Sequence, residues 1–362
     1  METKNQIQRK IKDQILANQF RGIVLSSVRS GKTRILLEAL QEDWGIERMI
    51  KPKVLVCYPN VDIKSSWETE CALIGYYPDI GYCTFASLHK IEDSDSWDYI
   101  VIDEAHLLGE ENQLPSSCKL VKNNDKIIFA SGTYNKNTLE ELQIHSGLDL
   151  IVNYSTDDAI KDGIVSDYTI FIHKYALDIS IVREFGQKKK WYSTESKECA
   201  RLTNKVDLSS GKERMFHSLA RMRFINTSHS LTAKVKNFLV KNPNKRFLLF
   251  AADEKTGKRY GIPMFNSKSK SCTNLENFQN GKINGLCLIK KGSAGVTYPN
   301  LQDIIITNLN SNSENLEQMI GRSLLTDTDK SNIHIFVSNQ RFQLKWLEKA
   351  LENIDKSRVI WV

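Results

Sequence analysis

The chain has 362 residues, of which 41% are hydrophobic and 26% are charged. This length is greater than one small binding module needs, and the composition excludes wholesale disorder. The longest apolar stretches, such as Val54–Cys57 and Ile304–Ile306, are far shorter than the ~20 residues that cross a bilayer. The polar N-terminal segment has no apolar signal core. We therefore expect a cytoplasmic protein with no membrane partner.

The net charge of +7 is unevenly distributed along the chain. Residues 1–155 carry 17 Lys/Arg and 22 Asp/Glu, whereas residues 156–362 carry 33 Lys/Arg and 21 Asp/Glu. This asymmetry favours a polyanionic partner that is held mainly by the second half. A solvated basic surface is the alternative interpretation.

The seven cysteines are odd in number and widely scattered, with no C-x-x-C pair. We therefore expect reduced thiols that mostly serve packing, and neither a disulfide framework nor a zinc site.

The first half of the chain alternates short β-rich runs with segments of helical periodicity. This alternation is typical of βαβ units and predicts a parallel sheet. The expected strands are Gly22–Ser26, Lys53–Tyr58, Tyr99–Glu104, Lys126–Ser131 and Asp149–Asn153, and the expected helices include Lys32–Gln41 and Val61–Ile74.

A second α/β series follows a polar stretch after Tyr154. Its expected strands are Thr169–Leu177, Arg246–Ala251, Gly285–Lys290, Asp303–Asn308 and Asn332–Val337, and its expected helices are Leu231–Leu239, Ser313–Ile320 and Gln340–Asn353. The pattern predicts two tandem domains, residues 1–155 and residues 156–362, with a helical and basic insertion near residues 183–223.

The segment from Ile23 to Thr33 has the pattern of a phosphate-binding loop. A β-rich run leads into Ser30-Gly31-Lys32-Thr33, where an amphipathic helix begins. Backbone N–H groups and the helix dipole can cradle phosphates, the Lys32 ammonium can neutralise them, and the Thr33 hydroxyl can ligate Mg²⁺. Ser26 replaces the first glycine of the usual pattern. A helix that happens to begin with Gly-Lys-Thr is therefore the alternative.

A second motif makes the phosphate-binding interpretation stronger. The apolar strand that begins at Tyr99 ends in the adjacent acids Asp103 and Glu104. At the carboxyl end of a sheet, Asp103 would hold Mg²⁺ and Glu104 would deprotonate the attacking water. The alternative is a surface pair of acids that caps the next helix.

These motifs and others in the same order resemble those of superfamily 2 helicases, of the type whose motif II reads DEAH. The segments that resemble motifs I, Ia, Ib, II, III, IV, V and VI are Val28–Thr33, Val54–Trp67, Thr84–Lys90, Asp103–His106, Ser131–Thr133, Arg246–Asp253, Lys290–Ile306 and Gln318–Arg322. The passage Tyr154–Tyr168 resembles that of XPB-like, restriction-translocase-like and phage UvsW-like enzymes, and the short length resembles compact phage or mobile-element versions.

The resemblance implies two tandem RecA-like domains, each a mostly parallel sheet with helices on both faces, and ATP and Mg²⁺ as cofactors. Nucleotide contacts are then expected from Gln8, Ser30, Gly31, Lys32, Thr33, Asp103, Gly295 and Arg322. Gln6 is the alternative to Gln8. The metal is expected at Thr33 and Asp103. Catalysis is expected from Glu104, Arg322, Gln318 and Lys32, with His106 as a coupling residue. Nucleic-acid contacts are expected from Lys64, Ser87, Ser131, Thr133, Lys290, Lys291 and Thr297. Trp67 is interpreted as a packing residue, with a base-stacking platform as the alternative.

Two departures from the family pattern concern hydrolysis. Leu325 stands where the second arginine of motif VI is expected, and Arg29 replaces a glycine of motif I. Either Arg322 suffices, another basic residue such as Arg341 substitutes, or hydrolysis is slow. The sequence therefore predicts an ATP-dependent helicase or translocase, a monomer that acts on DNA. The alternatives are an RNA helicase of the same architecture and a nucleic-acid clamp that binds ATP but hydrolyses it poorly.

Overall fold

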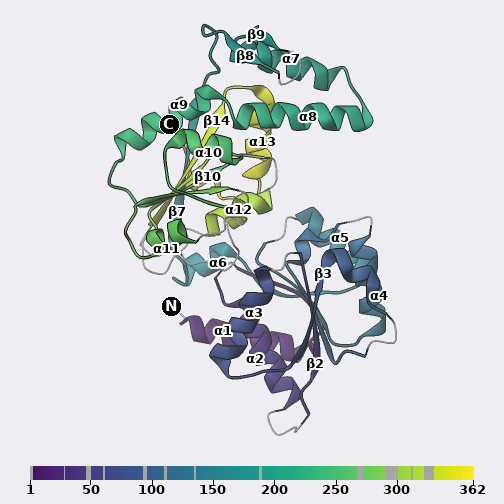
Figure 1. The fold of residues 1–362 in the computed structure, drawn as a ribbon. Coiled ribbons are helices and arrows are strands. Elements are labelled where there is room, and N and C mark those ends of the chain that lie inside the picture. Colours follow the sequence, from purple (N-terminus) through teal and green to yellow (C-terminus); the bar gives the residue numbers. More distant parts are fainter. Residues whose placement is uncertain are drawn as a thin grey trace. The chain divides into compact units, whose positions relative to one another are not determined.

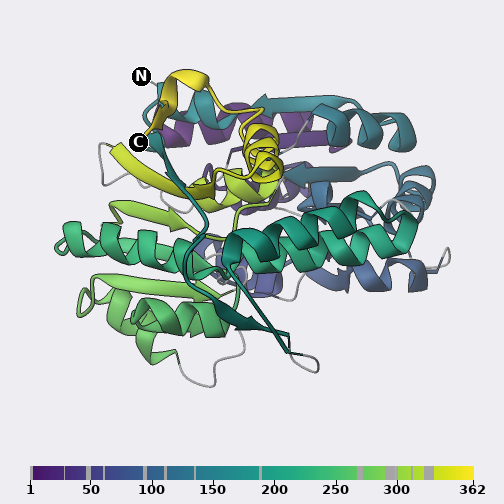
Figure 2. The same cartoon turned by 90° about the horizontal axis from the view of Figure 1, so that it is seen from above.

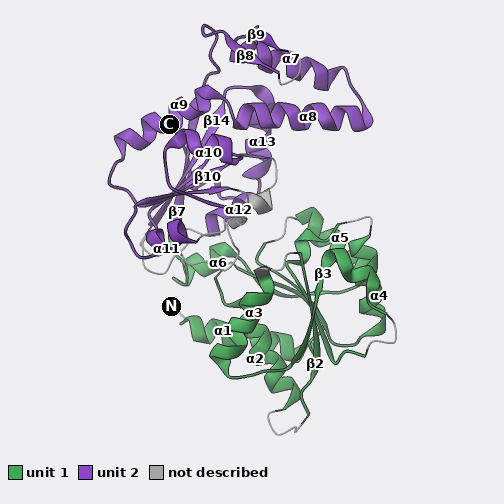
Figure 3. Cartoon of the chain, in the orientation of Figure 1, with its two compact units in different colours: residues 1–166, 294–296 green, residues 167–293, 297–362 purple. Residues whose placement is uncertain are grey.

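The computed structural model describes residues 3–27, 29–45, 50–59, 62–92, 96–109, 112–133, 136–186, 190–266, 272–289, 298, 301–310, 313–321 and 330–362. The chain divides into two compact units, which Figure 3 shows in different colours. Unit 1 comprises residues 1–166 with 294–296, and unit 2 comprises residues 167–293 with 297–362.

Unit 1 is built on a six-stranded sheet in the order β3-β2-β4-β5-β1-β6, in which every pair of neighbours is parallel. The strands are β1 (Gly22–Ser26), β2 (Lys53–Tyr58), β3 (Asp79–Thr84), β4 (Tyr99–Asp103), β5 (Ile127–Ser131) and β6 (Leu150–Tyr154). All residues of β4 and β5 are buried. Their continuous apolar runs are explained by helices that cover both faces of the sheet.

The helices of unit 1 lie on both sides of this sheet. One face is covered by α1, α2 and α3, and the other by α4 and α5 (Figure 1). The helical elements are α1 (Lys4–Ala17), α2 (Lys32–Trp44), α3 (Asp62–Ile74), α4 (Gln113–Asn123), α5 (Lys136–Ser146), α6 (Thr156–Lys161) and the 3₁₀ turns η1 (Phe85–Lys90) and η2 (Ala105–Leu107).

Unit 2 contains a seven-stranded parallel sheet in the order β11-β12-β10-β13-β14-β7-β15. The strands are β7 (Asp167–Tyr175), β10 (Phe247–Ala251), β11 (Met264–Asn266), β12 (Gly285–Ile289), β13 (Asp303–Ile306), β14 (Lys330–Ser338) and β15 (Val359–Trp361). The helical elements packed around it are α9 (His229–Lys241), α10 (Glu254–Tyr260), α11 (Thr273–Gln279), α12 (Ser313–Gly321), α13 (Arg341–Ala350) and η3 (Lys356–Arg358). The predicted fold class, two α/β domains with parallel sheets, is confirmed.

An arm follows β7 and precedes α9 in unit 2. It consists of the antiparallel strands β8 (Arg183–Phe185) and β9 (Trp191–Ser193) and the helices α7 (Glu195–Asp207) and α8 (Gly211–Asn226). The two helices pack side by side, as Figure 1 and Figure 2 show. The buried carboxylate of Glu195 accepts hydrogen bonds from the backbone N–H groups of His229 (2.6 Å) and Ser230 (3.2 Å), so it attaches the arm to the N-terminus of α9.

The boundary between the units lies at Ser166 and Asp167, later than the predicted boundary at residue 155. The reason is that α6 belongs to unit 1. Ser155 and Asp158 form a capping box at its start, and the Tyr154 hydroxyl donates to Asp162 Oδ2 (3.2 Å) at its end. Because α6 is thus held to the end of β6, the chain leaves unit 1 only at the start of β7.

In the part of the chain that the structure describes, no helix combines the length and the apolar character needed to cross a membrane. All seven cysteines are free thiols.

A pair of histidines, of which His334 is buried and His173 is half-buried, links β7 to β14 in unit 2. His173 Nε2 lies 3.0 Å from His334 Nδ1, and the His173 ring stacks on Phe336 with 4.5 Å between the centroids. Burial, together with the nearby charges of His334 and Lys234, lowers the pKa of His173 to about 4. His173 is therefore neutral in the folded protein at neutral pH.

This pair predicts an acid sensitivity of unit 2. The unfolded chain takes up a proton on His173 near its ordinary pKa of about 6.5, whereas the folded chain does so only near pH 4. Above about pH 6.5 the group is neutral in both states and does not affect stability, whereas at lower pH its protonation favours the unfolded chain. Because His173 is only half-buried and its charge is partly screened, we expect the free energy of unfolding to fall by about 1 kcal/mol between about pH 7.5 and 5. Urea unfolding of the wild type and of His173→Phe at both pH values measures the effect. An equal pH slope in both proteins would exclude His173 as its source.

Candidate nucleotide-binding and hydrolysis site

The loop between β1 and α2 forms a tight turn at one end of the unit 1 sheet. Gly31 is the N-cap residue of α2 and has a φ of 91°. The positive φ favours glycine, and a Cβ at this position would also push aside the end of the Gln8 side chain. Arg29 also has a left-handed backbone, with a φ of 68°. This conformation costs a non-glycine residue about 1–2 kcal/mol, which explains why a glycine is usual at the corresponding position of motif I.

The start of α2 presents polar groups at this turn. Among the described residues, no side chain caps the helix. Ser26 Oγ and Ser30 Oγ lie 2.6 Å apart, whereas the buried Ser27 Oγ has no hydrogen-bond partner in the described part of the chain. Because the positive end of the helix dipole adds to these groups, the turn is suited to binding an anion.

Lys32 joins this turn to the end of β4. Its Nζ atom lies 2.7 Å from Asp103 Oδ1 and 3.0 Å from Glu104 Oε1. β1 and β4 are both neighbours of β5 in a parallel sheet, so their carboxyl ends lie at the same edge. The strand order therefore brings together residues that are separated by 72 positions in the sequence.

The charges of this cluster stabilise one another. Burial acts to lower the pKa of Lys32, but the negative charges of Asp103 and Glu104 outweigh it and raise that pKa above its ordinary value. Burial acts to raise the pKa of Glu104, but the charges of Lys32 and His106 lower it below its usual range. Lys32 is therefore a cation and Glu104 a carboxylate at neutral pH.

His106 connects the acidic pair to the end of β5. Its Nδ1 atom lies 2.7 Å from Ser131 Oγ and 3.5 Å from Glu104 Oε2. The Ser131 hydroxyl donates to the Thr133 carbonyl (2.7 Å) and accepts from the Thr133 N–H (3.1 Å). Because the hydroxyl proton is used in this way, Nδ1–H of His106 is the donor to Ser131.

Ser131 and Thr133 are buried in this network. The Ser131 side chain faces His106, and both side chains are almost completely buried, so in this structure neither is exposed to a nucleic acid. The Thr133 hydroxyl has no hydrogen-bond partner among the described residues. These two residues are therefore placed to support the acidic pair.

The two candidate glutamines near the N-terminus have different surroundings. Gln8 is buried, and its Nε2 donates to the backbone carbonyl of Ser30 in the phosphate loop (2.7 Å). Gln6 instead forms a capping box with Thr3 at the start of α1. Only Gln8 of this pair contacts the site.

Trp67 is a site residue whose role the sequence analysis missed. It is fully buried on α3, and its Nε1–H donates to Asp103 Oδ2 (3.1 Å). Its burial is inconsistent with a base-stacking platform. The sequence signals only that Trp67 belongs to the apolar face of a helix.

The other predicted contacts of unit 1 are accessible to solvent. Lys64 on α3 has an exposed side chain that lies 3.6 Å from Glu68 Oε1 and 5.1 Å from the centre of the Tyr82 ring. Ser87 on η1 is partly exposed, and its hydroxyl accepts from the Thr84 hydroxyl (3.3 Å). Both follow the ends of neighbouring strands, β2 and β3.

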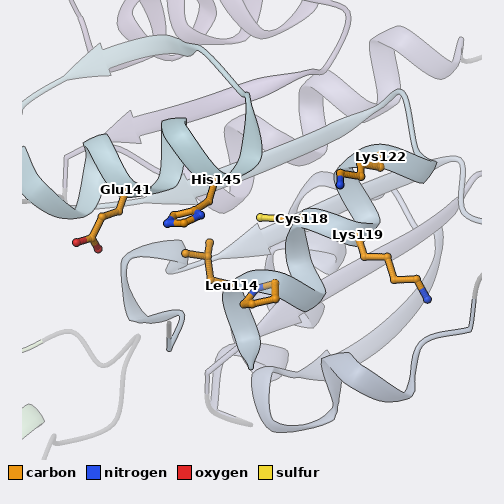
Figure 4. Close-up of a pocket in the computed structure, with 7 residues that line it drawn as sticks. Leu114, Cys118, Lys119, Lys122, Glu141 and His145 are labelled. Atoms are coloured by element: carbon orange, nitrogen blue, oxygen red, sulfur yellow. The ribbon is translucent and has the colours of Figure 1, made fainter. Parts of the chain in front are cut away.

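A cavity of about 570 Å³ lies between α4 and α5, away from the predicted residues. It is lined by Leu114, Pro115, Cys118, Lys119, Lys122, Glu141 and His145. Figure 4 shows Glu141 and His145 on one helix and Cys118, Lys119 and Lys122 on the other. None of the residues predicted to bind nucleotide or nucleic acid lines this cavity.

Comparisons with known proteins found a family match in the second half of the chain and a structural likeness over nearly all of it. Residues 231–324 match the family model described as the helicase conserved C-terminal domain. The whole chain resembles the structure of S. cerevisiae Dbp5 bound to RNA and ADP BeF3, with a TM-score of 0.60 and 10% identity over 98% of this chain and 89% of that one. The fold is that of a tandem RecA-like helicase.

A second structure with this helicase fold is the ATP-dependent Type ISP restriction-modification enzyme LlaBIII bound to DNA. Its TM-score is 0.61, with 14% identity over 98% of this chain and 31% of that one. The present chain thus spans about a third of the length of LlaBIII. A search of the curated proteins finds no match.

The part of the helicase site predicted in unit 2 is only partly described. Lys290, Lys291, Gly295, Thr297, Arg322 and Leu325 lie outside the described residues. Gln318 belongs to α12, but its side chain is not among those described. The match to residues 231–324 includes all of these positions except Leu325.

Proposed function

We propose that the chain is a nucleic-acid-stimulated ATPase that unwinds, remodels or moves along DNA, acting as a monomer. The observation that carries the proposal is the bridge from Lys32, at the start of α2, to Asp103 and Glu104. A lysine at a helix N-terminus that no side chain caps is suited to binding phosphate. Adjacent carboxylates provide a metal ligand and a general base. The helicase fold and the match to the helicase C-terminal domain support this combination.

The residues of unit 1 fit a nucleotide with its Mg²⁺ ion. The buried Ser27 hydroxyl, which lacks a partner among the described residues, and the uncapped start of α2 are suited to phosphate oxygens. Thr33, in the first turn of α2, and Asp103 supply the oxygen atoms that Mg²⁺ prefers. When bound, Mg·ATP would supply a reactive phosphoanhydride whose charge the metal partly neutralises.

Each residue of the cluster has a proposed role in hydrolysis. Lys32 exchanges its carboxylate partners for phosphate oxygens, which frees the Glu104 carboxylate. Glu104 then orients a water molecule and accepts its proton. His106 lies between Glu104 and Ser131. A movement of Ser131 at the end of β5 would therefore shift the position of the Glu104 carboxylate, which is the general base. From unit 2, Arg322 would stabilise the transferring phosphoryl group and Gln318 would help to position it.

DNA is proposed as the polymer because of the resemblance to UvsW-like and translocase-like enzymes. Dbp5 is bound to RNA and LlaBIII to DNA, so the relatives include both classes. The proposed strand contacts are Lys64 and Ser87 in unit 1 and Lys290, Lys291 and Thr297 in unit 2. The basic second half, with 33 Lys/Arg against 21 Asp/Glu in residues 156–362, favours a polyanion of either kind.

The test is steady-state ATP hydrolysis with single-stranded DNA, duplex DNA, branched DNA or RNA. We expect DNA to stimulate ATP turnover, because bound polymer would favour the arrangement in which Arg322 reaches the transferring phosphoryl group. Stimulation by RNA alone would indicate the RNA helicase.

The clamp is the second candidate, since Leu325 replaces an expected arginine. It would be indicated if ATP binds but no polymer raises turnover above the level of Glu104→Gln.

A further inference from the structure

The carboxylate of Asp103 is held from both of its oxygen atoms. Oδ1 accepts from Lys32 Nζ (2.7 Å) and from the backbone N–H of Glu104 (3.0 Å), whereas Oδ2 accepts from the indole N–H of Trp67 (3.1 Å). The first two partners belong to the phosphate loop and the acidic pair. Trp67 comes from a third element, α3.

The sheet explains why α3 reaches this carboxylate. β2, which α3 follows, is the direct neighbour of β4, with Cys57 opposite Ile102 in the register. The helix after β2 therefore passes close to the end of β4, where Asp103 lies. Both side chains are almost completely buried, with 0% of Trp67 and 3% of Asp103 exposed.

The chemistry of the pair restricts the carboxylate more than a hydroxyl or lysine partner would. An indole N–H can only donate, and a buried ring has no freedom to turn away. Lys32 is flexible and, under the proposed function, moves its charge to a phosphate. This exchange leaves two contacts of Asp103 in place, the Glu104 N–H on Oδ1 and the Trp67 N–H on Oδ2, and the Trp67 bond is the one that comes from a side chain.

We propose that Trp67 is a positioning residue that fixes the orientation in which Asp103 receives Mg²⁺. The assignment rests on the proposed function, because it needs a metal at Asp103. Trp67 itself touches neither metal nor nucleotide. It acts by holding Oδ2, so that Oδ1 points towards the start of α2, where Lys32 lies.

The test compares two tryptophan variants in unit 1. Trp67→Phe removes the N–H group and keeps an aromatic ring. Trp97→Phe makes the same change at a residue whose buried Nε1 has no partner among the described residues. The measurement is the Mn²⁺ affinity with a non-hydrolysable ATP analogue, read from the electron paramagnetic resonance signal of free Mn²⁺. Thermal unfolding of both variants is measured in parallel.

We expect Trp67→Phe to weaken Mn²⁺ binding about tenfold, as losses of outer partners of metal ligands do, and Trp97→Phe to leave it unchanged. A purely structural role would lower the unfolding temperature without this difference in affinity. Equal Mn²⁺ affinities in the two folded variants would overturn the role assigned to Trp67 and leave the proposed function untouched. Failure of the wild type to bind Mn²⁺ with the analogue would overturn the proposed function as well.

A second measurement does not require Trp67→Phe to fold. In the ¹⁵N-labelled wild-type chain, the indole N–H resonance that Asp103→Asn displaces should also shift when Mg²⁺ is added to the nucleotide-bound protein. An indole resonance that responds to Asp103→Asn but not to Mg²⁺ would contradict the proposal.

Discussion

Glu104→Gln is expected to reduce ATP turnover at least about a hundredfold while ATP binding is retained, because removal of a general base costs roughly 10²–10⁴ in rate. Glutamine has nearly the same shape, so it can still accept from Lys32, but it cannot take a proton from water. The lowered pKa of Glu104 keeps the wild-type carboxylate ionised well below neutral pH. The wild-type kcat/KM, which reports the free protein, should therefore show no acidic decline from this group between about pH 6 and 8. Phosphate release and fluorescent-nucleotide binding measure the two quantities separately.

Glu140→Gln is the matched control for this experiment. Glu140 is an exposed glutamate of α5 that pairs with Lys136 at 3.9 Å. Its substitution should leave turnover unchanged. Near-normal hydrolysis by Glu104→Gln would remove Glu104 from the mechanism.

Lys32→Ala is expected to affect both binding and stability. ATP affinity should fall about a hundredfold or more, as the loss of a buried charge partner costs roughly 3–5 kcal/mol. For the same reason the free energy of unfolding should fall by about 3 kcal/mol at neutral pH, since Asp103 and Glu104 lose the cation between them. Nucleotide titration and urea unfolding measure the two effects.

The pH dependence of this variant has a defined sign. Because the folded-state pKa of Glu104 is lowered, its stabilisation is present above the ordinary pKa of about 4.3 and is lost as the pH falls through the lowered value. The stability difference between the wild type and Lys32→Ala should therefore be largest at neutral pH and shrink in acid.

Lys126→Ala provides the comparison. Lys126 also pairs with an aspartate, Asp43, at 2.6 Å, but both side chains are more exposed than those of Lys32 and Asp103. Its effect on stability should be smaller, and ATP affinity should not change. If the two lysine variants lost ATP affinity equally, the loss would reflect general destabilisation and not a phosphate site.

Within the site, local sequence and tertiary contacts contributed different information. The loop around Gly31 and the acids after Tyr99 were recognisable because a glycine turn and an apolar run are local patterns. The choice between Gln8 and Gln6 was not available locally, because both lie on α1. Only the folded chain shows that Gln8 reaches Ser30 whereas Gln6 caps its own helix. In the same way, the bond from His106 to Ser131 depends on β5 lying beside β4.

The sequence by itself determined the α/β class, the two series of parallel strands and the start of α2 at Lys32, because these follow from hydrophobic periodicity and turn residues over short segments. It also predicted the paired acids at the end of β4. Tertiary structure alone decided that α6 belongs to unit 1, that Ser131 and Thr133 are buried, and that Trp67 holds Asp103. The physical reason is that strand order and helix packing join residues far apart in the chain, and no local pattern specifies which pairs will meet.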